Sequence, residues 1–474
     1  MCAMNEMPSS NVGPPDTRLD VAADQIDGLL HRARRRIEEA LTWNNIYRAT
    51  SYLRSALWTI PLLSIVLVLI LAPLLRVVDE WLAWRLSGLS VSGAQALYQT
   101  TITLTLSFVV FTFGSLLVAI QVAGVQLTPR IIATTLLRDN VVRYSVGLFV
   151  FTLVFAVMAL NRLDKTVYDI VSLLTAMLGI ACVAMFLFLI DYAARLLRPV
   201  SILARVGDEG VSVIKAVYPE RLGAAPEVET AFVVPPGRRR VVPHSGASAI
   251  VLAVDLDTLV ADARRAGGIV EFVPQVGDFV CTGEPLFELY GDAVSIATHR
   301  LQSSVAFGPE RTMEQDPLFA FRIITDIALK ALSPAINDPT TGVLALDQLH
   351  RLLRIVGRCR LRSDTIVDRA GTPRVIVRTP NWEDFVAIAC TEIRAYGAGN
   401  VQIARRLRAM LDNLIGTLPA GRQAALDGER RRLDLAIASL YALPEDRDLA
   451  AVPDTQGLGG SSASRLPGSN STQE

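Results

Sequence analysis

The densest group of polar and charged residues lies between Phe307 and Leu349, in two segments that each predict a capped helix. Asp316 and Asp338 each precede a proline, and that pair of residue types is typical of a helix start. Carboxylates together with an asparagine suit a divalent cation, and an arginine suits an anion. The predicted ligand site consists of Glu310, Arg311, Asp316, Asp326, Asn337 and Asp338. The alternative is that these residues only cap two helices and form a salt-bridged turn.

Catalytic chemistry has less support in the sequence. A nucleophile needs a neighbouring base, and Ser333, which precedes Pro334, has no activating motif around it. The five cysteines include no CxxC pair and the four histidines are scattered, so neither a zinc ribbon nor a disulfide scaffold is predicted. We therefore rank an enzyme last, assign no catalytic residue and expect no cofactor.

A row of polar residues follows one helical face of an uncharged stretch. The row consists of Thr101, Thr105, Thr112, Ser115 and Gln126. In hydrocarbon, such a face avoids lipid and meets another helix or water. It predicts either the lining of a pore or close helix packing, in which the hydroxyls bond to carbonyls of their own helix.

The segment that follows this stretch predicts a helix on the membrane surface. Pro129 marks its start, and Arg130, Arg138 and Arg143 could hold the phosphates of anionic lipid headgroups. The alternative role is ion pairing of Arg138 or Arg143 with Asp139.

The elements that position these residues follow from four stretches without charge. They contain 21, 44, 18 and 21 residues and follow Arg54, Arg85, Arg143 and Asp169, respectively. Because a helix needs roughly 20 apolar residues to cross a membrane, we predict a four-span α-helical domain over residues 51–200. The 44-residue stretch begins with LSGLSVSGAQA, so we expect one span near 98–125 preceded by a polar loop or re-entrant segment.

Charge in the connections predicts which side of the membrane the termini occupy. Eleven basic residues lie at positions 34–54 before the first span, 130–143 in the second connection and 195–205 at the end of the last span, and four lie on the other side. The positive-inside rule then places both termini in the cytoplasm.

After residue 200 the composition becomes that of a cytoplasmic α+β domain. Residues 201–306 predict a β-rich subdomain with a small β-barrel or sandwich, from runs such as IVLAVDL, GIVEFVP and PLFELY. The GDFVCTGE pattern looks like half of a lipoyl or biotinyl carrier domain, but a carrier needs a modified lysine there and none is present. Residues 307–444 predict a helical subdomain.

The ends of the chain have different compositions. Residues 1–19 predict a disordered N-terminus, residues 20–50 a basic amphipathic helix and residues 445–474 a disordered tail. The basic helix is expected either on an anionic membrane surface or packed on the protein's own cytoplasmic domain.

Whole-chain composition narrows the class of protein. Hydrophobic residues make up 51% of the 474 residues, which excludes a chain that is disordered throughout. The 46 basic and 46 acidic residues cancel, which removes the usual charge argument for nucleic-acid binding.

Several motifs together resemble the domain-of-unknown-function 2254 family of predicted bacterial membrane proteins. These motifs are TPR at 128–130 with Arg138 and Asp139, GDFV at 277–280, ERT at 310–312 with Gln315 and Asp316, and ALSPAINDPTT at 331–341. The resemblance covers roughly residues 45 to 440 and implies an integral membrane protein with several spans near its start and a soluble remainder. It implies no activity, substrate or catalytic residue.

These features leave two functions open. The first is a channel or transporter-like oligomer whose cytoplasmic domain regulates it. The second is a membrane-anchored sensor or scaffold with a ligand site in the cytoplasmic domain. For both we expect a bacterial inner-membrane protein that contacts anionic headgroups, assembles as a homo-oligomer and binds no nucleic acid, with its small-molecule or ion ligand unknown.

Overall fold

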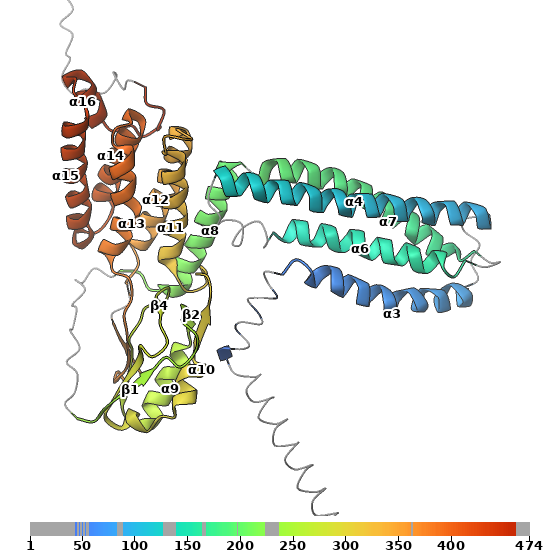
Figure 1. The fold of residues 1–474 in the computed structure, drawn as a ribbon, viewed down its shortest axis with the longest axis horizontal. Helices are drawn as coiled ribbons and strands as arrows, with labels where there is room; N and C mark the ends of the chain where they lie inside the picture. Colours follow the sequence, from blue (N-terminus) through green and yellow to red (C-terminus); the bar gives the residue numbers. More distant parts are fainter. Residues whose placement is uncertain are drawn as a thin grey trace, which may run out of the picture.

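The chain forms a bundle of long helices followed by a separate C-terminal domain (Figure 1). The computed structural model describes residues 56–82, 89–126, 139–163, 167–196, 198–222, 237–361 and 364–460, together with Trp43, Asn44, Tyr47, Thr50 and Leu53. The predicted disordered N-terminus, and all of the predicted basic helix except Trp43, Asn44, Tyr47 and Thr50, lie outside these residues.

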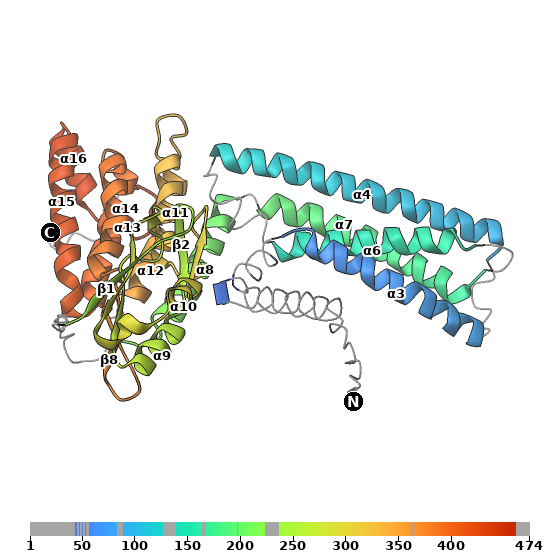
Figure 2. The ribbon, with the colours of Figure 1, turned by 60° about the horizontal axis from the view of Figure 1, so that its bottom comes forward.

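Four antiparallel helices make the bundle, and Figures 1 and 2 both show them side by side. They are α3 (Thr59–Leu82), α4 (Val91–Gln126), α6 (Asn140–Leu160) and α7 (Asp169–Leu196). Among the described residues, three helices (α4, α6 and α7) are long and apolar enough to cross a membrane. In α3 the apolar part is the shorter segment Thr59–Leu75. The predicted N-terminal helical region is thus confirmed with three candidate membrane helices, and the fourth span remains a prediction.

The expected polar loop before the second span is wrong from Val91 onward. Residues 91–126 form one continuous helix of 36 residues, and the Gly93 amide donates to Ser90 Oγ at its start (3.1 Å). Ala94 and Tyr98 are buried against the neighbouring helices, and the Tyr98 hydroxyl lies 2.8 Å from Ser172 Oγ on α7. Packing of this first part of α4 outweighs the weak helix preference of its Ser and Gly residues.

Helix α6 lies next to each of the other three bundle helices. A Cβ atom added to Gly147 on α6 would lie 2.6 Å from Ile60 Cγ2 on α3. The missing side chain therefore allows α3 and α6 to approach closely, as small residues do in membrane bundles.

The C-terminal domain contains two small sheets. The first has the order β1-β5-β3-β8-β7 and the second the order β4-β2-β6. The strands are β1 (Arg239–Pro243), β2 (Ala249–Val254), β3 (Ile269–Phe272), β4 (Phe279–Val280), β5 (Pro285–Tyr290), β6 (Val305–Gly308), β7 (Thr365–Val367) and β8 (Pro373–Val377). Side chains from both sheets form one core, together with α9 (Leu256–Ala266), which ends at left-handed Gly267. Short helical turns, η2 (Gly291–Ser295) and α10 (Thr298–Ser303), connect β5 to β6.

A second core lies among the helices of this domain. These helices are α8 (Pro199–Val217), α11 (Pro317–Ala331), α12 (Pro339–Val356), α13 (Trp382–Gly397), α14 (Val401–Thr417) and α15 (Gln423–Leu440). The sequence predicted strands before residue 307 and helices after it, but β7 and β8 return to the first sheet from between α12 and α13.

The predicted disordered tail is wrong for residues 445–460. Helix α16 (Pro444–Ala451) continues the fold, and residues 452–460 then lie against α14. Arg405 of α14 is fully buried and donates to the carbonyls of Val452 and Gly459, each at 3.1 Å. A guanidinium group has five donors, so one arginine can order a segment that lacks an apolar pattern. Residues 461–474 lie outside the described ranges.

Two aromatic residues before the bundle contact the second sheet. The rings of Trp43 and Tyr47 stack with centroids 5.2 Å apart, and both pack against Leu252, Ala253 and Ala306. For these two residues, the contact favours the alternative in which the basic helix packs on the protein's own C-terminal domain.

Candidate functional site

The three threonines on the polar face of α4 are turned into the bundle. Thr101, Thr105 and Thr112 are buried, and each hydroxyl donates to a backbone carbonyl of its own helix, at 2.9, 2.7 and 2.7 Å. Ser115 is exposed and bonds in the same way to the Thr112 carbonyl. The side chain of Gln126 lies outside the described residues. Hydroxyl groups bonded to their own helix are what the helix-packing alternative predicts for this face.

Of the residues predicted to contact the membrane surface, the structure describes Arg143. Its guanidinium donates to Thr59 Oγ1 at 2.7 Å and to the Leu53 carbonyl at 3.3 Å. Arg143 therefore joins α6 to the start of α3. Pro129, Arg130 and Arg138 lie outside the described ranges.

Asp139 connects the bundle to the C-terminal domain. One carboxylate oxygen accepts from the Val141 and Val142 amides and caps α6. The other accepts from the Tyr192 hydroxyl of α7 (2.5 Å) and from the Arg205 guanidinium of α8 (2.6 Å). Three helices thus meet at one buried carboxylate, which we call the Asp139 junction.

Three of the predicted ligand-site residues lie at the start of α11, and two of them meet the turn between β3 and β4. The Arg311 Nε donates to the Gly277 carbonyl at 2.8 Å. Asp316 Oδ1 caps α11 through the Phe319 amide, and its Oδ2 is buried without a hydrogen-bond partner in the described part of the chain. Burial raises the pKa of Asp316 to about 6, while the Arg311 charge acts in the opposite direction. Glu310 is exposed beside them.

Gly277 makes this contact possible. Its φ of +96° is in the left-handed region, and an added Cβ would lie 2.6 Å from Asp316 Oδ2 and 3.1 Å from Arg311 Cζ. Glycine is therefore required at position 277 for two reasons: the left-handed backbone angle, and the lack of room for a Cβ atom beside Asp316 and Arg311.

The remaining predicted residues lie toward the other end of α11. Asp326 accepts from Arg322 Nε at 2.6 Å, and Asp338 caps α12 through the Thr341 amide (3.1 Å). Asn337 has a left-handed φ of +50° in the turn between the two helices. Because α11 has 15 residues and so spans ~22 Å, the structure does not bring Asn337 or Asp338 to Asp316. Within the described residues, no group of three His, Cys, Asp or Glu side chains could hold a metal ion.

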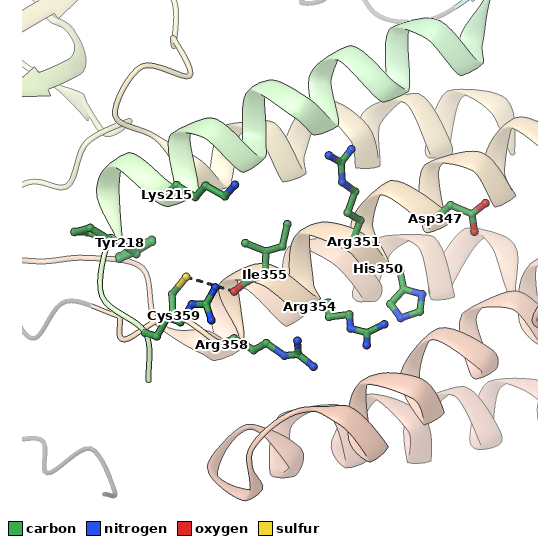
Figure 3. A pocket seen from close by; sticks show the side chains of 11 residues that line it. Lys215, Tyr218, Asp347, His350, Arg351, Arg354, Ile355, Arg358 and Cys359 are labelled. Carbon is green, nitrogen blue, oxygen red and sulfur yellow. Dashed lines mark hydrogen bonds between the residues drawn. The ribbon is translucent and has the colours of Figure 1, made fainter. Parts of the chain in front are cut away.

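A groove between α8 and α12 was not identified from the sequence (Figure 3). Its volume is about 850 Å³, and most of its lining side chains are basic or polar. The lining residues are Lys215, Tyr218, Pro219, Arg221, Asp347, His350, Arg351, Arg354, Ile355, Arg358 and Cys359. We call this feature the basic groove.

At one end of the basic groove, His350 is held as a neutral ring. The Arg406 guanidinium lies 3.3 Å from its Nδ1, and a guanidinium can only donate. Nδ1 therefore accepts, and Nε2 donates to Asn413 Oδ1 at 2.9 Å. Burial, together with the nearby arginines, lowers the pKa of His350.

A sequence signal for the groove exists in HRLLRIVGR at 350–358. Its arginines recur at three- and four-residue steps and so share one helical face. Such a face is also typical of an ordinary solvated helix. Only the position of Lys215 and Arg221 opposite it, from another part of the chain, distinguishes a binding groove.

This fold and these sites define a multi-pass membrane protein with an N-terminal helical bundle and a C-terminal domain of small sheets and helices. The chain belongs to the family described as "Predicted membrane protein (DUF2254)", whose model matches residues 54–413. The resemblance seen in the motifs is thereby confirmed.

Relatives of the chain are found in mycobacteria. The "Uncharacterized protein Rv1290c" of Mycobacterium tuberculosis is 27% identical over 405 residues, which cover 80% of this chain and 74% of that protein. The "Uncharacterized protein Mb1321c" of Mycobacterium bovis matches with the same identity and coverage. No solved structure matches the chain closely enough to count as similar.

Proposed function

We propose that this protein is a membrane-anchored sensor, in which ligand binding to the C-terminal domain changes the transmembrane bundle through α8. One observation carries the proposal: α8 contributes to both sites. Arg205 near its start pairs with Asp139 of the bundle at 2.6 Å, and Lys215 near its end lines the basic groove. A rigid helix that contacts both sites can transmit a displacement between them.

The proposed orientation has the C-terminal domain and both ends of the chain in the cytoplasm of a bacterium. The excess of basic residues in the connections on the side of the C-terminal domain supports this orientation. The bundle is proposed to span the inner membrane four times, with α3 as the additional span. The close approach of α3 to α6 at Gly147 supports including it.

The channel hypothesis has less support. It depended on the hydroxyl face of α4, and Thr101, Thr105 and Thr112 on that face are buried within one chain and bonded to their own helix. No observation on the described residues favours a second function over the sensor.

Hydrogen–deuterium exchange of the full chain in lipid nanodiscs tests the sensor. Nucleotides, inorganic polyphosphates, divalent cations and lipid headgroups are added in turn. We expect at least one compound to slow exchange in α8 and α12, and also to change exchange in residues 139–145. In Arg205→Gln the first effect should remain and the second should disappear. If every compound that protects α8 leaves residues 139–145 unchanged, or if no compound protects α8, the proposal is wrong.

A further inference from the structure

We propose that the basic groove binds an oligophosphate, that is, a small molecule with several linked phosphate groups. This would be the compound that the proposed sensor detects, so its regulatory role rests on the proposed function, whereas its binding does not. A volume of about 850 Å³ lies within the range of small-molecule sites, which is about 300–1,000 Å³.

The charges that line the groove are mostly unneutralised. The single lining carboxylate, Asp347, pairs with Arg406 at 2.6 Å, and Arg351 pairs with Asp208 at 2.7 Å. The side chains of Lys215, Arg221 and Arg354 make neither a hydrogen bond nor an ion pair with any residue of the described ranges. Among the described residues, the Arg358 side chain makes a single hydrogen bond, a long one of 3.4 Å to the Thr417 carbonyl. Four cations therefore face the groove without a carboxylate partner.

The placement of these cations favours a ligand with several phosphates over a single phosphate. Arg354 lies on α12 and Arg358 just beyond its end, so they are ~6 Å apart along the helix axis. Figure 3 shows their side chains extending side by side from the α12 side of the groove, with Lys215 extending from α8. A chain of linked phosphates offers several anionic groups, so it can contact cations on both walls and along α12 at once.

The groove also has an apolar part. Tyr218, Pro219 and Ile355 line it beside the cations. An organic group attached to the phosphates, such as a nucleoside, would have a surface to contact there. The same chemistry is presented by a free oligophosphate and by a phosphorylated lipid headgroup.

Calorimetric titration of the full chain in zwitterionic nanodiscs with inorganic triphosphate tests the proposal. We expect binding that weakens as salt increases, and monophosphate should bind at least tenfold more weakly. Lys215→Gln and Arg354→Gln should each weaken triphosphate binding by about tenfold or more, as expected for loss of a charge-assisted hydrogen bond. Both side chains are exposed, so neither change removes a buried contact. Arg431→Gln, an exposed arginine on α15 outside the groove, is the matched control and should leave binding unchanged.

Further arms separate the two sources of phosphate. If triphosphate does not bind but phosphatidic acid vesicles compete for a site that requires Arg354, the ligand is a lipid headgroup with the same phosphate chemistry. If neither binds, or Arg431→Gln weakens binding as much as Arg354→Gln, the proposal is overturned. It is also overturned if only a duplex oligonucleotide binds in an Arg354-dependent way.

The same data separate this proposal from the sensor. Triphosphate binding that leaves exchange at residues 139–145 unchanged would retain the ligand, and it would exclude the sensor if no other compound that protects α8 changes exchange there. If triphosphate does not bind but a different compound changes exchange at residues 139–145, the sensor proposal stands and the oligophosphate proposal is wrong.

Discussion

The Arg205 guanidinium donates to the Asp139 carboxylate at 2.6 Å, and so joins the first helix of the C-terminal domain to the first turn of a transmembrane helix. The Asp139 side chain is only 3% exposed. Removing the arginine would leave that buried carboxylate with the Tyr192 hydroxyl and two amides as donors.

For this pair we predict that Arg205→Gln lowers the free energy of unfolding by about 1–3 kcal/mol, because the buried Asp139 carboxylate loses a charged hydrogen-bond donor. Thermal unfolding in detergent measures the change. Arg195→Gln is the control, because the pair of Arg195 with Asp191 is exposed on both sides and such pairs contribute about 0–1 kcal/mol. Equal effects of the two substitutions would contradict the structural role of the Asp139 junction.

Gly277→Ala should destabilise the protein by about 2–4 kcal/mol, because it combines a left-handed backbone angle with overlap at Asp316 and Arg311. Gly283→Ala is a close control: its φ is +90°, but nothing lies within 4 Å of an added Cβ. That substitution should cost only the backbone strain, about 1–2 kcal/mol. Thermal unfolding of both variants measures the two losses of stability. If Gly277→Ala destabilises the protein no more than Gly283→Ala does, overlap with Asp316 and Arg311 is not the cause.

The stability of the protein should fall as pH rises through the pKa of Asp316. Burial raises that pKa from 3.8 to about 6, so the folded state favours the protonated carboxyl. The resulting stabilisation is complete below about pH 4 and is lost as pH rises through about 6, with a maximum size of about 3 kcal/mol. In Asp316→Asn this part of the pH dependence should disappear, because the amide is always neutral and its oxygen can still cap α11.

Melting temperatures between pH 4 and 8 measure this effect for the wild type and Asp316→Asn. Asp338→Asn is the matched control, because Asp338 also caps a helix but both of its oxygens accept hydrogen bonds. The account is wrong if Asp316→Asn retains the wild-type slope between pH 5 and 7.

Asp454→Ala should release the segment at residues 452–460. Its carboxylate accepts from the amides of Gln456, Gly457 and Gly459 at 2.8–3.0 Å, which holds the turn that Arg405 contacts. We expect a loss of about 1–3 kcal/mol and faster proteolysis within 452–460. Asp448→Ala, at an exposed position on α16, should change neither. Unchanged proteolysis in Asp454→Ala would contradict this role.

Gly147→Val should disturb the bundle, because even a Cβ atom at this position would lie 2.6 Å from Ile60 of α3. Overpacking of this kind costs about 1–3 kcal/mol. Gly114→Val on α4 is the control, since nothing lies within 4 Å of an added Cβ there. Thermal unfolding in nanodiscs distinguishes the two. If Gly147→Val is no more harmful than Gly114→Val, α3 is not packed on α6 in the membrane.

Much of the local structure could be predicted from the sequence. The run at 250–256 overlaps β2, and the runs at 268–274 and 285–290 contain β3 and β5, because these runs are rich in β-branched and aromatic residues. Asp316 and Asp338 cap helices as their spacing with proline predicted. These features depend on neighbouring residues, so one sequence is sufficient to find them.

Features that depend on distant residues could not be predicted. The start of α4 has a loop-like composition, and its helix is stabilised by tertiary burial of Ala94 and Tyr98. The basic groove requires Lys215 and Arg354 to line one cavity from helices that are separated in the chain by six strands, β1 to β6. The meeting of Gly277 with Arg311 and Asp316 likewise follows from the docking of a β-turn onto the start of α11.

The parallel pairing of β3 with β8 has a consequence for biosynthesis. Its partners Val270 and Val375 are 105 positions apart (375 − 270), and α11 and α12 lie between them in the chain. During translation, the bundle helices and strands β1 to β6 leave the ribosome before β8 has been synthesised. Until then, one edge of β3 has unpaired backbone groups that could pair with another nascent chain. Insertion of the bundle into the bilayer would anchor each nascent chain during this interval, so this edge would stay at the membrane surface until β8 closes the sheet.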